Sequence, residues 1–187
     1  DNRCFGYAVL SALFPVDNNV CRPNQYIKHF DEIRFDGIEF PVKLSSIQKF
    51  EKLNRDFCST CRHYNCSDEA HLHGLAILVF EWKKDGPNPL RVSEQIGHII
   101  RLMLLQDEDN WHYTYIKGFH RLLRHVTGYH KRQFWCDKCL YVTTYEHVMK
   151  THTEDCLGID KSPCRIVMPQ KGDLIQFQNI RKQLKAP

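Results

Sequence analysis

Six of the nine cysteines in this 187-residue chain lie in two short groups, and each group combines a Cys-x2-Cys step with nearby histidines. The first group consists of Cys58, Cys61 and Cys66, and the second of Cys136, Cys139 and Cys156. An odd cysteine count argues against a complete disulfide framework, and clusters of this kind favour metal ligation or thiol chemistry in a reducing compartment. We therefore expect an intracellular protein, nuclear or cytoplasmic, whose fold is constrained by metal ligands.

The second group continues as Cys136-x2-Cys139-x12-His152-x3-Cys156. This spacing is typical of a small ββα finger, in which a hairpin presents two thiolates and a helix presents His152 and Cys156. Such a set closes a tetrahedral Zn²⁺ site with bonds of roughly 2.0–2.3 Å. A segment this short buries too little apolar surface to fold alone, so we expect it to fold only with its metal.

The first group continues as Cys58-x2-Cys61-x4-Cys66-x4-His71, which is the spacing of a zinc knuckle with its last two ligand types exchanged. His63 and His73 are alternative ligands. Residues 55–69 contain almost no apolar side chains, so little except a metal ion would order them. A second zinc site is therefore predicted here, and the alternative is a surface loop that binds metal only adventitiously.

Apolar patterning predicts an α+β fold with one main domain. A helix is expected over 5–14, with strands over 75–82, 98–105 and 111–117 and a turn at 85–89. We expect a papain-like core over 1–127, in which the N-terminal helix packs on an antiparallel sheet and residues 55–73 form an insert. A finger over 128–157 and a tail over 158–187 follow. Every apolar stretch is much shorter than the apolar segment of about 20 residues that a membrane helix needs, so no membrane span is expected.

Cys4 and His112 form a candidate catalytic pair. Cys4 follows Arg3 in the first turn of the expected helix, and both features favour the thiolate form. His112 begins a strand about 100 residues later, which is the layout of papain-like thiol hydrolases. Cys4 would then be the nucleophile, His112 the general base and Asn2 an oxyanion donor. The third member is open among Asn110, Asp107 and Asp109, and the alternative is that Cys4 and His112 have only structural roles.

Several motifs resemble the region upstream of the exonuclease domain in protein-primed family B DNA polymerases of Polinton/Maverick-type transposons and related viruses. They are Asn2-Arg3-Cys4-Phe5, Phe40-Pro-Val-Lys-Leu44, Phe50-Glu-Lys-Leu-Asn54, Pro89-Leu-Arg-Val-Ser93, His112-Tyr-x-x-Ile-Lys117, the finger from Phe134 to Cys156, and Leu184-Lys-Ala-Pro187. The resemblance covers most of the chain apart from the cysteine-rich insert. It implies a module of a polymerase gene product.

The Cys4 and His112-Tyr113 elements are also similar to those of deubiquitinases, most nearly the tegument-type enzymes of herpesviruses. Those enzymes carry Asp two residues before the histidine, where this chain has Asn110. This likeness implies a thiol peptidase that acts on ubiquitin or a ubiquitin-like protein. The alternative is a non-enzymatic zinc-finger module that binds DNA or protein partners for the polymerase. The basic flank that would contact DNA comprises Arg121, Arg124, Lys131 and Arg132.

Overall fold

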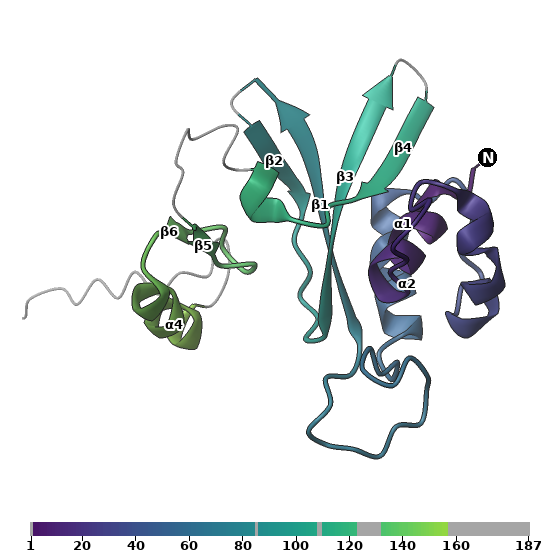
Figure 1. Ribbon diagram of the computed structural model, residues 1–187, viewed down its shortest axis with the longest axis horizontal. Helices are drawn as coiled ribbons and strands as arrows, with labels where there is room; N and C mark the ends of the chain where they lie inside the picture. Colours follow the sequence, from purple (N-terminus) through teal and green to yellow (C-terminus); the bar gives the residue numbers. More distant parts are fainter. Residues whose placement is uncertain (1, 85, 108–109, 123–131, 157–187) are drawn as a thin grey trace, which may run out of the picture.

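The computed structural model describes residues 2–84, 86–107, 110–122 and 132–156. It has an α+β architecture, in which helices cover one face of a four-stranded sheet and a small ββα unit lies against the other (Figure 1). The expected domain boundary at 127 and the expected tail over 158–187 fall outside the described residues. Within the described ranges, no helix combines the length and the apolar character needed to cross a membrane.

The sheet has the order β2-β1-β3-β4. Its strands are β1 (Leu75–Lys83), β2 (Gly86–Arg91), β3 (His98–Asp107) and β4 (Asn110–Tyr115). The three strands predicted from the sequence are confirmed. The prediction of an antiparallel sheet is wrong, because β1 and β3 run parallel while the two outer pairs are antiparallel. After β2, residues 92–97 return the chain to the end of the sheet where β1 starts, and the sheet is therefore mixed.

Strand β2 occupies the segment whose prolines suggested only a turn. Pro87 lies opposite Trp82 and Pro89 opposite Phe80. Proline is tolerated on an edge strand wherever its nitrogen does not have to donate to the ladder. Because β2 is the outer strand, its prolines are compatible with pairing on one side and leave the other side poorly suited to further pairing.

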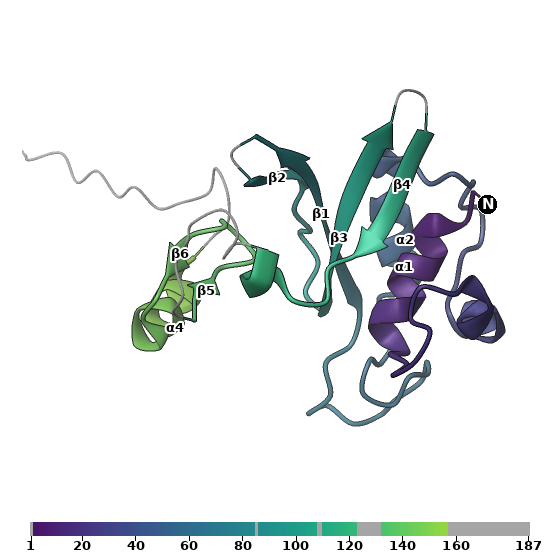
Figure 2. The same ribbon diagram turned by 45° about the horizontal axis from the view of Figure 1, so that its top comes forward.

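The helical side of the sheet carries the main core. Helices α1 (Cys4–Leu13) and α2 (Ile47–Leu53) lie there, together with the short 3₁₀ helices η1 (Pro23–Gln25), η2 (Ile27–Glu32) and η3 (Leu44–Ser46) (Figures 1 and 2). Alternate strand residues share this core with the helices: Leu75, Ile77, Val79, Ile100, Leu102 and Leu104. Phe5 of α1 packs edge-on against Phe50 of α2 and Tyr113 of β4. Aromatic contacts therefore join both helices to the sheet.

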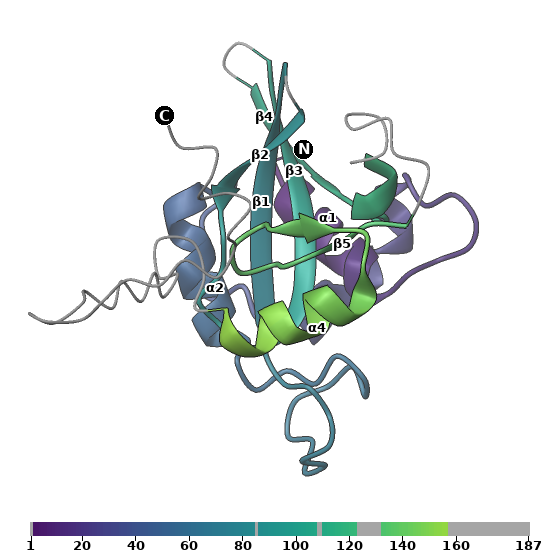
Figure 3. The same ribbon diagram turned by 90° about the vertical axis from the view of Figure 1, so that its left-hand side faces the viewer.

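The opposite face of the sheet is covered by the ββα unit, as Figure 3 shows. This unit consists of β5 (Phe134–Trp135), β6 (Val142–Thr143) and α4 (Glu146–Asp155), in agreement with the predicted finger. Trp135 packs on Phe119, which in turn packs on Phe80 of β1. Arg101 of β3 donates two hydrogen bonds to the carboxylate of Asp137, at 2.8 and 2.6 Å. The centre of this face, at Leu78, Phe80 and Met103, is thus buried, while Trp82 and Leu105 stay about half exposed.

A buried ion pair joins α2 to β1 and β2. Glu51 is only 1% exposed, and its carboxylate accepts hydrogen bonds from the Arg91 guanidinium and from the Ile77 amide. Arg91 also donates to the Ile77 carbonyl, at 2.5 Å. Strand β2 pairs with β1 only from Val79 onward. The Glu51–Arg91 pair therefore satisfies the backbone groups of Ile77 where no neighbouring strand does.

Replacing Arg91 by methionine should destabilise the fold by about 3–5 kcal/mol, because it leaves the buried Glu51 carboxylate without its cation. Urea denaturation followed by circular dichroism measures the loss. The exposed Glu39 provides the control, since Glu39→Ala should change stability by less than about 0.5 kcal/mol. A loss in Arg91→Met no larger than in this control would contradict the role assigned to the pair.

Candidate metal centres and the Cys4 groove

The ligand atoms of Cys136, Cys139, His152 and Cys156 all lie within 4.8 Å of one another. The Cys136 and Cys156 sulfurs are 3.6 Å apart, and the Cys139 sulfur is 3.1 Å from His152 Nε2. A zinc tetrahedron has S···S edges of about 3.8 Å and S···N edges of about 3.6 Å, given its usual bond lengths. The sulfur pair is close to the expected edge and the Cys139–His152 contact is shorter than expected, so the grouping as a whole is compatible with Zn²⁺.

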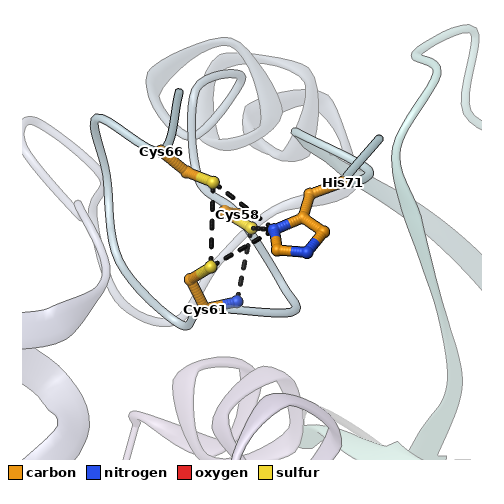
Figure 4. Close-up of side chains that lie close together, drawn as sticks. All are labelled: Cys58, Cys61, Cys66 and His71. Atoms are coloured by element: carbon orange, nitrogen blue, oxygen red, sulfur yellow. Dashed lines mark hydrogen bonds between the residues drawn. The ribbon is translucent and has the colours of Figure 1, made fainter. Parts of the chain in front are cut away.

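The second cluster lies in the loop before β1, and Figure 4 shows its four side chains converging. Cys58, Cys61, Cys66 and His71 also place their ligand atoms within 4.8 Å of one another. The Cys61 and Cys66 sulfurs are 3.7 Å apart. Nδ1 of His71 lies 3.7, 3.3 and 3.5 Å from the sulfurs of Cys58, Cys61 and Cys66, respectively. These distances also match the edges of a zinc tetrahedron.

The structure selects His71 from the three histidines that the spacing allowed. Nδ1 of His63 instead lies 2.7 Å from the carbonyl oxygen of Tyr64. The backbone of His73 pairs with that of Cys58, and its Nε2 is buried with no hydrogen-bond partner among the described residues. Neither ring belongs to the four-ligand cluster.

The two Cys-x2-Cys steps fold into the same turn. Arg62 and Leu140 each follow the second cysteine of their step, and they have positive φ angles of 61° and 64°. The Arg62 amide donates to the Cys58 carbonyl at 2.7 Å, and the Leu140 amide donates to the Cys136 carbonyl at 2.8 Å. Neither residue type favours the left-handed region, so residue identity could not predict this turn. Two segments far apart in the sequence therefore form the same turn, and each turn places its two cysteine sulfurs on one side.

The candidate ligand His71 has a carboxylate next to its second ring nitrogen. Its Nε2 lies 3.4 Å from the carboxylate of Asp68, while Nδ1 points to the three sulfurs. A carboxylate on the second ring nitrogen fixes the orientation and tautomer of a ligating histidine and raises its basicity. Sequence spacing had not indicated Asp68, although its position three residues before His71 is within reach of the ring.

Tyr64 anchors the cysteine-rich loop over 55–73 to the core. Its hydroxyl donates to the Oδ1 atom of the fully buried Asn54, and its ring packs edge-on against Phe57. Asn54 Nδ2 donates in turn to the carbonyls of Arg34 and Phe50. The order of the loop is thereby coupled to the end of α2.

Within each cluster, neighbouring sulfurs help to raise the pKa of one thiol, Cys61 or Cys139, and so oppose its ionisation. Burial opposes the ionisation of Cys58, but hydrogen bonds from Cys61, Cys66 and Thr60 outweigh it and lower the pKa of Cys58 to about 6. The hydrogen bond with Cys66, together with burial, raises the pKa of Cys61 to about 12. Burial is the main reason that the pKa of Cys139 rises to about 11. A divalent cation would relieve this by stabilising several thiolates together.

Cys4 is the first residue of α1, and its side chain lies against the outer edge of β4. Its sulfur is 3.8 Å from the Trp111 carbonyl and accepts a hydrogen bond from the Tyr113 amide at 3.4 Å. These two backbone groups lie on either side of His112 in the chain. The thiol is nearly buried, at 6% exposure.

Cys4 and His112 line one groove of about 720 Å³ between α1 and β4. The His112 side chain is exposed, and no hydrogen bond between it and the Cys4 sulfur is present among the described residues. Asn110 starts β4 two positions before His112, and Asn2 precedes α1; both side chains are exposed. Asp109 lies outside the described residues. The catalytic pair and its orienting residue therefore stay a prediction.

Comparisons with protein-family models, with curated proteins and with solved structures found no match to this chain. The resemblance to transposon polymerases and the likeness to deubiquitinases consequently stay predictions from the sequence.

The contact between Asp68 and His71 leads to a specific prediction. Asp68→Asn retains an oxygen for its hydrogen bond from the Ala70 amide but removes the negative charge beside His71 Nε2. Zinc affinity at the loop cluster should fall about tenfold, while the finger should be unaffected. Competition with a chromophoric chelator measures both affinities. Asp56→Asn is the matched control, because Asp56 pairs with Arg55 and not with a ligand. Equal effects of the two substitutions would contradict the role of Asp68.

Proposed function

We propose that both Cys3His clusters bind Zn²⁺ and that the chain is a zinc-stabilised accessory module, of the kind expected upstream of a transposon-type polymerase. The observation that carries the proposal is the presence of two independent clusters, each with tetrahedral spacing and each built on the same Cys-x2-Cys turn. Thiolate ligation requires a reducing environment, which supports an intracellular location.

In this proposal the finger is a structural cap. Cys136, Met149 and Cys156 form its small buried cluster, which is too limited to hold the unit together without an ion. Asp137, in the turn between Cys136 and Cys139, pairs with Arg101, and Trp135, directly before Cys136, packs on Phe119. Zinc in the finger would therefore keep the second face of the sheet covered.

The charge on α4 supports a structural role for the finger over DNA recognition. Its exposed side chains include the carboxylates of Glu146, Glu154 and Asp155 and only one lysine, Lys150. A negatively charged helix is poorly suited to approach DNA phosphates. Within the described residues, the predicted basic flank is represented by Arg121 and Arg132; Arg124 and Lys131 fall outside them.

Native mass spectrometry of the chain should show two zinc ions. Cys139→Ser and Cys61→Ser should each reduce this number to one, and limited proteolysis should then cut within 132–156 in the first variant and within 55–73 in the second. Cys21→Ser is the control, because Cys21 is exposed and outside both clusters, and it should retain two ions. A metal-free chain that resists proteolysis in both segments would contradict the proposal.

A second candidate function is that of a thiol hydrolase. The observation that favours it is the shared groove, in which Cys4 lies at the start of a helix and its sulfur is next to the backbone on either side of His112. In this role His112, after its ring turned toward the sulfur, would take the Cys4 thiol proton, and the thiolate would add to a peptide carbonyl. His112 would then give the proton to the leaving amine as the C–N bond breaks and an acyl-enzyme forms, which water would hydrolyse. Ubiquitin or a ubiquitin-like protein is the substrate expected from the resemblance.

Alkylation rates distinguish this candidate from a purely structural Cys4. Iodoacetamide at pH 6 should modify a His112-activated Cys4 at least about tenfold faster than Cys21, and His112→Ala should abolish the difference. Cys21 is a matched reference, because it lines the same groove but is exposed. A structural thiol at 6% exposure would instead react more slowly than Cys21, and that result would refute the hydrolase role.

A further inference from the structure

The outer edge of β4 has backbone groups that point away from the sheet. Ile116 donates to the Arg101 carbonyl, so the even-numbered residues of this segment pair with β3. The odd-numbered residues Trp111, Tyr113 and Tyr115 therefore direct their amides and carbonyls outward. The Cys4 sulfur contacts the Trp111 carbonyl and the Tyr113 amide. The Tyr115 amide has no hydrogen-bond partner among the described residues.

The two edges of the sheet, β2 and β4, differ in how well they are protected against pairing with a further strand. The edge strand β2 carries Pro87 and Pro89, which discourage pairing with another strand. Strand β4 contains no proline and is blocked by Cys4 only at its first half. An unprotected outward-facing residue such as Tyr115 is a template for a further strand.

Space for such a strand exists beside Tyr115. The groove of about 720 Å³ runs along this edge and is walled on the other side by α1. Of the α1 residues that line it, Ala8, Ser11 and Ala12 are small and leave space, and Tyr7 is the one large side chain. Its volume falls within the range of ordinary ligand sites.

The lining indicates the chemistry of the occupant. Val16, Val20 and Tyr26 supply apolar contacts. Among the lining residues that the structure describes, Lys117 carries the one formal positive charge and there is no carboxylate. An apolar segment with an acidic residue near Lys117 is complementary to this surface. An extended polypeptide backbone offers a donor and an acceptor at the spacing that Tyr115 presents.

From these features we propose that the groove between α1 and β4 binds an extended peptide of a partner protein, which adds to the sheet as a strand antiparallel to β4. The peptide exchanges two hydrogen bonds with Tyr115, places alternate apolar side chains against α1 and places a carboxylate at Lys117. It ends beside Cys4, whose sulfur occupies the next pairing position. This binding needs no reactivity of Cys4 and does not rest on the functions proposed above.

The first experiment measures hydrogen exchange of the Tyr115 amide by NMR, using the intact zinc-loaded chain at several dilutions. The amide should exchange rapidly in the free chain, because nothing pairs with it. Protection that is independent of dilution would show that a segment of the chain itself occupies the edge. Protection that grows with concentration would show that a second copy does. Either result would overturn the proposal.

The second experiment selects phage-displayed random heptapeptides against the same chain. Enriched peptides should alternate apolar residues and carry Asp or Glu, and their synthetic versions should protect the Tyr115 amide. Methylating the peptide nitrogens one at a time should weaken binding about tenfold at alternate positions only, which is the period of strand pairing. Failure to enrich any peptide, or binding that leaves Tyr115 unprotected, would also overturn the proposal.

The charge at the end of the groove is tested by a matched pair of variants. Lys117→Glu should weaken the selected peptides up to about fivefold, as expected for an exposed ion pair. Lys52→Glu makes the same charge change at an exposed residue of α2 outside the groove, and it should leave binding unchanged. Equal effects of the two variants would show that the peptide does not contact Lys117.

Discussion

We propose that two segments of this chain depend on ligand bonds to a divalent cation. The loop over 55–73 and the finger over 132–156 have few apolar side chains to bury, and hydrophobic burial is the usual source of stability in a domain. Three sulfurs and one imidazole around Zn²⁺ can supply that stability instead, because such a site forms only when the chain folds around it. The main core needs no such help, since α1 and α2 bury a continuous apolar face of the sheet.

The two clusters act on different parts of the same sheet. The finger packs on the sheet face opposite the helices through Trp135 and Asp137. The cysteine-rich loop over 55–73 is tied to the end of α2 through Tyr64 and Asn54. If both clusters hold an ion, as we propose, loss of either one would therefore affect more than its own ligands. The groove at Cys4 lies at the outer edge of β4, where neither cluster contributes a lining residue. Peptide binding or thiol chemistry there can be studied separately from metal binding.

Much of the fold could be predicted from residue patterns, because the information was local. Ligand spacing defined the finger, and apolar runs defined α1, β1, β3 and β4. The parallel pairing of β1 with β3 was missed, because pairing direction depends on how distant segments meet. Strand β2 was missed as well, because Pro87 and Pro89 favour the prediction of a turn. They are compatible with a strand only at the edge of a sheet, and the sequence does not show which strand is at the edge. The burial of Glu51 was not visible either, since a charged residue is buried only when a partner such as Arg91 arrives from elsewhere.

The central claim concerns the ions themselves, and zinc K-edge X-ray absorption on the purified chain tests it most directly. The account predicts a first shell that averages three sulfurs at about 2.3 Å and one nitrogen at about 2.0 Å, with two zinc ions in each molecule. A shell dominated by oxygen or nitrogen, or a folded chain without zinc, would contradict the account.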